Sequence, residues 1–115
     1  MKSPEPLSFL PLPNLSFYIL LALGSGAAHG WAIIKRIHEL TEGEANPSSG
    51  SLYLAMVRLE DSDLIEEDDA PPDADARRRY YRLTRLGRAV ARAEGERLAR
   101  LVRHAREWDL LKGSK

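Results

Sequence analysis

The feature that most constrains this chain is a long helical run near its C-terminal end, from about Arg85 to Leu111. Its apolar residues recur at spacings of 3, 4 and 3, the rhythm of a coiled-coil seam, and they are Leu98, Leu101, Ala105 and Trp108. A chain of 115 residues forms one small domain, which has too little surface to cover such a stripe. The pattern therefore predicts a homodimer that packs through these four residues.

The composition is typical of a folded protein, because 43% of the residues are hydrophobic and 30% are charged. There is no cysteine, which excludes disulfides and thiolate metal sites and agrees with a reducing cytoplasm. The longest apolar run, Phe17 to Leu23, is far shorter than the roughly 18 residues that span a bilayer. We therefore expect a cytoplasmic protein with no membrane segment and no secretion signal.

Periodicity and capping residues predict three helices, a hairpin and a long last helix. The first thirteen residues contain four prolines and are expected to form an irregular arm. We predict helices over about 14–23, 28–40 and 50–61, with Asn14 and either Ser48 or Ser49 as N-caps. Strands are predicted over 64–67 and 77–83, and Thr84 is predicted to cap the last helix.

The charges are separated along the chain although they sum to zero. An acidic block covers residues 61–75, and an arginine-rich block covers residues 77–106. A local basic strip binds phosphate even when the whole molecule is neutral, so the composition leaves nucleic-acid binding open.

The predicted order of elements is the layout of a winged helix-turn-helix. In that layout the third helix enters the major groove of DNA, and the hairpin, called the wing, lies beside it over the backbone. By order alone, residues 50–61 form the recognition helix and residues 66–79 form the wing.

Four local motifs make this prediction more specific. The segment 29–33 reads H-G-W-A-I and resembles an H-G-Y-x-I motif, and 48–53 reads S-S-G-S-L-Y and resembles S-x-G-T-L-Y. Residues 59–65 resemble L-E-x-x-G-L-I, and residues 77–87 resemble R-R-x-Y-Y-x-L-T-x-x-G. These motifs occur in this order in the PadR family of transcriptional regulators, and the chain resembles that family over residues 15–90.

The resemblance implies an α+β, mainly helical, winged helix-turn-helix fold with a long C-terminal dimerisation helix. It divides the chain into an arm (1–13), a DNA-binding domain (14–83) and a dimerisation helix (84–115). The implied function is regulation of transcription, with the homodimer binding double-stranded DNA at a pseudo-palindromic operator and acting as a repressor. We expect neither enzyme activity nor a cofactor, since no catalytic constellation and no metal-ligand spacing occurs in the sequence.

Two departures from the family pattern bear on the wing. Asp63 stands where the family has glycine, and aspartate is among the few residues that tolerate a left-handed backbone. Ala76 stands where the family often has a glycine before its arginines. The acidic residues near the wing tip would repel phosphate, so we expect DNA contact nearer the base of the wing; they are Glu66, Glu67, Asp68, Asp69, Asp73 and Asp75.

The predicted DNA-contacting residues lie on the wing and on the recognition helix. Arginines 77–79 are predicted to contact phosphates or enter the minor groove, and the alternative is charge compensation of the acidic loop. On the recognition helix we predict contacts from Ser49, Ser51, Tyr53 and Arg58, and the alternative for Ser49 is simple N-capping. The full set on the wing is Arg77, Arg78 and Arg79.

Two aromatic residues have competing interpretations. His29 is expected to be structural, capping or bracing the second helix, rather than a metal or proton sensor. Trp108 is expected in the dimer core, and the alternative is that it stacks a small aromatic effector, since some members of the resembled family sense phenolic or drug-like molecules between their C-terminal helices.

Two rival functions remain open at this point. The first is a winged-helix protein-interaction adaptor that does not bind DNA, which the zero net charge and the acidic wing favour. The second is a dimer pocket around Trp108 that binds a small molecule without a DNA partner. Salt-sensitive DNA binding distinguishes both from a regulator, because contacts to phosphates release counterions.

Overall fold

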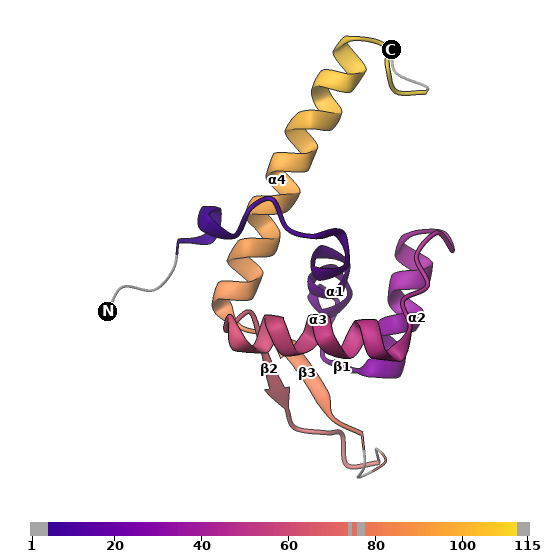
Figure 1. Ribbon diagram of the computed structural model, residues 1–115, viewed down its shortest axis with the longest axis vertical. Coiled ribbons are helices and arrows are strands. Elements are labelled where there is room, and N and C mark those ends of the chain that lie inside the picture. The colour runs from indigo at the N-terminus through magenta and orange to yellow at the C-terminus, as the bar shows by residue number, and fades with distance from the viewer. Residues whose placement is uncertain (1–4, 74, 76–77, 113–115) are drawn as a thin grey trace.

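The computed structural model describes residues 5–73, 75 and 78–112. Within these residues the chain forms four α-helices, a short 3-10 helix and three strands. In chain order the elements are η1 (Pro6–Phe9), α1 (Asn14–Gly24), β1 (Ala28–His29), α2 (Gly30–Leu40), α3 (Ser49–Asp61), β2 (Ile65–Asp68), β3 (Tyr80–Leu83) and α4 (Arg85–Glu107). Helices α1 to α3 and the small sheet form a compact part of the molecule, which we call the head. Helix α4 starts at the head and extends away from it (Figure 1). The predicted mainly helical winged-helix fold is confirmed.

The core of the head forms where the apolar faces of the first three helices meet the sheet and the start of α4. Its buried members come from every one of these elements and include Ile19, Leu20, Leu23, Ile33, Ile37, Leu52, Leu59, Leu64, Ile65 and Val90. The predicted buried stripe of α3 is confirmed, since Leu52, Met56 and Leu59 are all buried. The stripe fixes the rotation of α3, so its other side chains face away from the core.

The sheet contains a strand that the sequence did not reveal. The strand order is β1-β3-β2, with both pairs antiparallel, and Ala28 in β1 lies opposite Tyr81 in β3. Residues 28 and 29 were predicted to begin the second helix, which instead begins at Gly30. A two-residue strand has no periodicity of its own, and its partner lies about fifty residues away in the sequence. Only the tertiary pairing defines it.

Several predicted boundaries were wrong. The last strand begins at Tyr80, so Arg78 and Arg79 precede it and do not alternate across a strand as predicted. Arg77 and Ala76 lie outside the described residues. Helix α1 includes Asn14 as its first residue and has Pro13 at the N-cap position. Helix α4 ends at Glu107, so Trp108 is its C-cap rather than part of its seam.

The other predicted caps are confirmed. Ser48 caps α3 by accepting the Ser51 N–H, and Thr84 caps α4 by accepting the Gly87 N–H. The Nδ1 atom of His29 accepts the N–H of Ala32, so His29 has the capping role expected of it. Each cap satisfies an amide that the first turn of a helix leaves without a partner.

The predicted irregular arm contains the 3-10 helix η1, which packs against α4. The backbone N–H of Leu12 donates to the Glu94 carboxylate, and the Arg97 guanidinium donates to the same carboxylate. Glu94 is only 1% exposed, although it interrupts the apolar face of α4 in sequence. The hydrogen bond from Arg97 holds the pKa of Glu94 below its usual value, against the opposing effect of burial. A buried carboxylate therefore joins the N-terminal segment to α4.

A close contact joins the connection after α3 to the start of α4. Asp63 has a φ of 62°, so the left-handed conformation expected at this non-glycine position is confirmed. The carbonyl oxygen of Leu64 accepts the N–H of Thr84 and lies so near Gly87 that a Cβ atom there would be 1.9 Å from it. This approach explains the glycine of the L-T-x-x-G motif: a side chain at residue 87 would overlap the backbone of residue 64.

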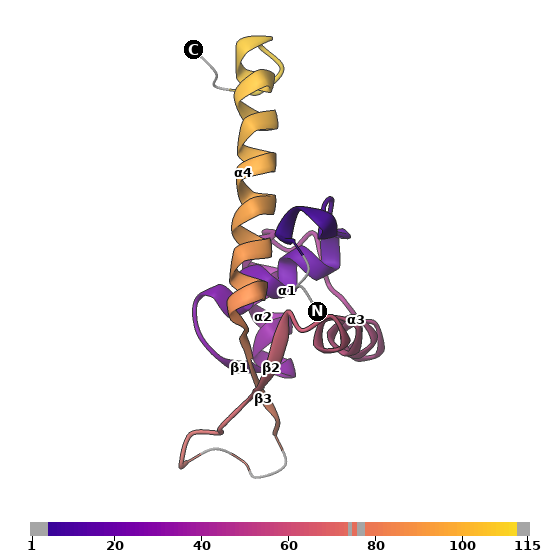
Figure 2. The ribbon, with the colours of Figure 1, turned by 90° about the vertical axis from the view of Figure 1, so that its left-hand side faces the viewer.

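The two ends of α4 have different surroundings. Its first turns pack on the head, whereas its last turns extend beyond it, on the side opposite the hairpin (Figure 2). Among the described residues, no helix combines the length and apolar character needed to cross a membrane.

Candidate nucleic-acid interface

The exposed side of α3 carries the residues predicted to contact DNA. Ser49, Ser51, Tyr53 and Arg58 are all exposed, and Tyr53 is 66% exposed. The Ser48 hydroxyl accepts the N–H of Ser51 and donates to its hydroxyl, so the front of the helix is ordered by its own cap. An exposed tyrosine near serine hydroxyls is suited to contacting phosphate oxygens and groove edges.

A cavity of about 600 Å³ lies between α2, α3 and β3. It brings together four of the predicted DNA-contacting residues, since Ser49, Tyr53, Arg78 and Arg79 all line it. Ser51 and Arg58 are not among its lining residues. The same cavity is lined by residues that the sequence did not assign to the site, namely His29, Trp31 and Tyr81. The H-G-W motif was the sequence signal for His29 and Trp31, and the R-R-x-Y-Y motif was the signal for Tyr81.

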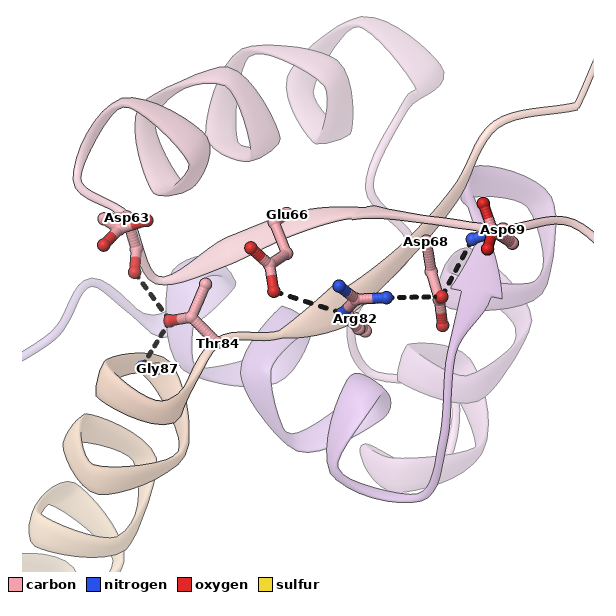
Figure 3. A network of polar contacts seen from close by, with 7 residues as sticks. All are labelled: Asp63, Glu66, Asp68, Asp69, Arg82, Thr84 and Gly87. Carbon is pink, nitrogen blue, oxygen red and sulfur yellow. Dashed lines mark hydrogen bonds and ion pairs between the residues drawn. The ribbon is translucent and has the colours of Figure 1, made fainter.

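The acidic strand of the wing is paired by an arginine that was not predicted to do so. Arg82 donates to Glu66 at 3.1 Å and to Asp68 at 2.6 Å, across the two strands of the hairpin (Figure 3). These hydrogen bonds raise the pKa of the Arg82 guanidinium. The charge compensation considered for residues 77–79 is thus present at Arg82. It lowers the net negative charge that the wing presents to a phosphate.

Arg79 has a weaker link to the acidic strand. Its Nε lies 3.7 Å from a carboxylate oxygen of Glu67, and both side chains are largely exposed. An exposed ion pair at this distance contributes little to stability, because water screens it and both side chains lose freedom. Arg79 can therefore exchange Glu67 for a phosphate at small cost.

The Arg78 side chain contacts His29, which lies on the neighbouring strand β1. Its Nη1 lies 2.9 Å from Nε2 of His29, and the His29 ring also packs edge-on against Tyr80. Burial, followed by the neighbouring charges of Arg78 and Arg36, lowers the pKa of His29. The lowered pKa favours the neutral imidazole.

Burial and the carboxylates of Glu60 and Glu67 raise the pKa of the Tyr81 hydroxyl. Tyr81 thus stays protonated at neutral pH and can donate a hydrogen bond into the cavity it lines. Among the described residues, no group of three or more His, Asp or Glu side chains is placed to hold a metal ion.

The residues predicted to form the dimer seam lie on the distal part of α4 and just beyond it. Leu98 and Ala105 are partly buried, while Leu101 is 51% and Trp108 is 74% exposed in the single chain. Their role in an interface stays a prediction.

Three helices, a hairpin beside the third of them, and a cavity lined by hydroxyl and guanidinium groups define a winged helix-turn-helix of the DNA-binding type. Residues 19–93 match the model of the transcriptional regulator PadR-like family, and the chain belongs to this family. The model of that family describes transcriptional regulators.

Solved structures of similar fold support this assignment. A transcriptional regulator from Clostridium thermocellum is 26% identical, with a TM-score of 0.67 over 81% of this chain and 87% of the other. RosR of H. salinarum is 29% identical, with a TM-score of 0.62 over 80% and 79% of the two chains. A PadR family regulator from Clostridium difficile R20291, at 23% identity, shares the fold with a TM-score of 0.70 over 84% and 98%.

One curated relative is much longer than the region that matches this chain. An uncharacterized 37.1 kDa protein in transposon TN4556 of Streptomyces fradiae is 36% identical over 83 residues, or 72% of this chain. The match covers only 22% of that relative's length.

Proposed function

We propose that this protein is a homodimeric repressor that acts by occupying a pseudo-palindromic operator. The observation that carries the proposal is the convergence of Ser49 and Tyr53 from α3 with Arg78 and Arg79 from the base of the wing around one cavity. A recognition helix and a basic wing base that face the same space can contact the groove and the adjoining backbone together.

The charges of the wing determine where DNA would lie. Arg82 engages Glu66 and Asp68, which leaves Arg78 and Arg79 as the guanidinium groups that line the cavity. Glu67 and Asp69 are exposed further along the same strand and loop. DNA therefore approaches the α3 side of the hairpin base, and the acidic tip stays away from the backbone.

The distal part of α4 supplies the dimer interface in this proposal. Leu98, Leu101, Ala105 and Trp108 would pack against the same residues of a second copy, which removes their apolar surface from water. A two-fold axis through this seam presents two α3 helices to two half-sites, so the operator repeats in inverted order.

An effector can act through the same helix. Helix α4 follows β3 directly through its cap, Thr84, so a change in the angle between paired α4 helices alters the separation of the two wings. A small aromatic molecule stacked near Trp108 would shift operator affinity if it favoured one separation. In this proposal the protein acts in the cytoplasm, because that is where it would meet its operator DNA.

Selection of duplexes from a random DNA library, at low and at high salt, tests the proposal. We expect an inverted repeat to be enriched at low salt, and binding to fall steeply with salt because phosphate contacts release counterions. The double variant R78A/R79A should lose this binding. The matched control is R100A/R103A, which removes two exposed arginines from distal α4 and should bind like the wild type.

A second candidate function is favoured by the acidic face of the wing, where Glu66, Glu67 and Asp69 are exposed. An adaptor that binds a basic partner through this face would show no enriched duplex and no salt-dependent DNA binding. That outcome would contradict the repressor proposal.

A further inference from the structure

The imidazole of His29 has a hydrogen-bond donor at each of its two nitrogens. Nδ1 accepts the backbone N–H of Ala32 at 3.2 Å, which caps α2. Nε2 lies 2.9 Å from Nη1 of Arg78. A guanidinium has only donors and stays charged at any ordinary pH. Both neighbours of the ring therefore present N–H groups.

A neutral imidazole cannot accept both of these hydrogens. It carries one N–H and one acceptor nitrogen, and the acceptor is already used by the cap of α2. The ring proton then lies on Nε2 and faces the Arg78 N–H groups. Moving the proton to Nδ1 would satisfy Arg78 but would place two N–H groups face to face at the helix cap. In either tautomer, one pair of donors lacks an acceptor.

An acceptor placed between His29 Nε2 and the Arg78 guanidinium would resolve this conflict. The two groups lie side by side at the edge of the cavity that Ser49, Tyr53 and Arg79 also line. No carboxylate belongs to the described lining residues, and Arg36, the other nearby guanidinium, is occupied by the carbonyl oxygens of Ala22 and Gly26. An anion from outside the chain would supply the acceptor that these lining residues lack.

We propose that His29 and Arg78 together clamp one backbone phosphate of bound DNA, with Nε2–H of His29 and the guanidinium of Arg78 each donating to a phosphate oxygen. This inference rests on the proposed function, because it takes double-stranded DNA as the ligand. Phosphate is favoured over other anions because the clamp lies beside the first turn of α3, where Ser49 and Tyr53 face the same cavity. His29 thus becomes both a helix cap and a phosphate-binding residue.

The variant H29N separates the two roles of His29. Asparagine is a good N-cap, so its side-chain oxygen can accept the Ala32 N–H and preserve α2. Its shorter side chain withdraws the donor from Arg78. The matched control is H38N, the same substitution at an exposed position of the same helix, away from this cavity.

Fluorescence anisotropy with a duplex that the wild type selects measures the effect at fixed salt. Loss of a hydrogen bond to a charged group predicts about tenfold weaker DNA binding for H29N. H38N should bind within about twofold of the wild type, because His38 does not line this cavity. Circular dichroism and thermal melting of both variants check that the fold is intact.

A phosphate-by-phosphate test identifies the ligand of the clamp. Each phosphate of the selected duplex is replaced in turn by an uncharged methylphosphonate. The wild type should lose affinity at one position in each half-site, and H29N and R78Q should both be insensitive at that same position. The double variant H29N/R78Q should be less weakened than the product of the two single losses, because both residues bind one phosphate.

The outcomes separate the two proposals. Wild-type binding with an unaffected H29N, or additive losses at different phosphates, would overturn the clamp and leave the proposed function standing. If the wild type selects no duplex, the proposed function fails as well. Inorganic phosphate alone provides a further arm: if it shifts the imidazole NMR signals of His29 while H29N binds DNA normally, the pair is an anion site but not a DNA clamp.

Discussion

The two halves of α4 share one helix and have opposite surroundings. In the proximal half, Gly87, Val90 and Glu94 are buried against the head and the N-terminal segment. In the distal half, Leu101 and Val102 are 51% and 41% exposed, and Trp108 beyond it is 74% exposed. The proximal half is therefore buried by the rest of the chain, whereas the distal half keeps an apolar stripe that is largely exposed among the described residues.

Burial within the described chain therefore accounts for only part of the apolar pattern of α4. The head and η1 pack against α4, and the buried Glu94 pairs with Arg97 between the proximal and distal parts of the helix. A polar group is tolerated there because its charge is paired and hydrogen-bonded. The distal stripe has no such polar break from Leu98 onward at its seam positions, as expected for a surface that meets a second copy.

The largest effect on stability is expected from G87A, which disturbs the packing of the proximal half of α4 on the head. The added Cβ would lie 1.9 Å from the carbonyl oxygen of Leu64, so backbone must move. We expect a loss of about 3 kcal/mol or more in the free energy of unfolding, measured by urea denaturation.

The matched control is G95A in the same helix, where no described atom outside the helix's own turn lies within 4 Å of the added Cβ. Alanine there should raise stability by up to about 1 kcal/mol, because it is the better helix former. Equal destabilisation by both variants would contradict the proposed packing at residue 87.

The variant E94Q tests the ion pair of Glu94 with Arg97, which lies between the two halves of α4. Glutamine still accepts the Leu12 N–H but loses the charged hydrogen bond to Arg97, so we expect a loss of about 2 kcal/mol near pH 7. The control E96Q changes an exposed glutamate of the same helix and should stay within about 0.5 kcal/mol of the wild type.

The effect of E94Q should depend on pH. The pKa of Glu94 is lowered in the folded chain, mainly by Arg97, so its charge stabilises the fold above the pKa of the unfolded chain. This contribution disappears as the pH falls through the lowered folded-state pKa. The difference between wild type and E94Q should therefore shrink in acid; a difference that grows there would show that burial, not Arg97, dominates.

The variant L101K tests the distal half. A lysine on the seam would place a charge in the proposed dimer interface, where a buried leucine contributes about 1.5–3 kcal/mol. We expect monomers by analytical ultracentrifugation at concentrations where the wild type is dimeric, with thermal stability of the head little changed. Lysine at the exposed Ala99, on the opposite side of the helix, should leave the dimer intact. Dimers in both variants would contradict this interface.

The smallest effect is expected from T84A, which removes the cap of the proximal half. The Thr84 hydroxyl accepts the Gly87 N–H and donates to the Asp63 carbonyl oxygen (Figure 3). Its loss should lower the free energy of unfolding by about 1 kcal/mol, followed by thermal denaturation. T84S keeps the hydroxyl and should restore most of the stability; if it does not, the methyl group rather than the cap matters.

The sequence alone determined the features that depend on near neighbours. Helix α3 and its buried stripe followed from i, i+4 and i+7 spacing, and the caps Ser48 and Thr84 followed from hydroxyl residues placed before helical runs. The left-handed backbone of Asp63 followed from the motif and from the tolerance of aspartate. These signals lie within one or two turns of the residue concerned, so no tertiary information is needed.

Tertiary structure alone decided the contacts between distant segments. Strand β1 exists because Ala28 meets Tyr81, Glu94 is buried because Leu12 reaches it, and His29 faces Arg78 although 49 residues separate them. The cost of such contacts in chain entropy is met only by the packing of the whole head, which no local pattern encodes. Local patterns thus predicted the helices and the wing, whereas the donors that converge at the cavity between α2, α3 and β3 became visible only in the folded chain.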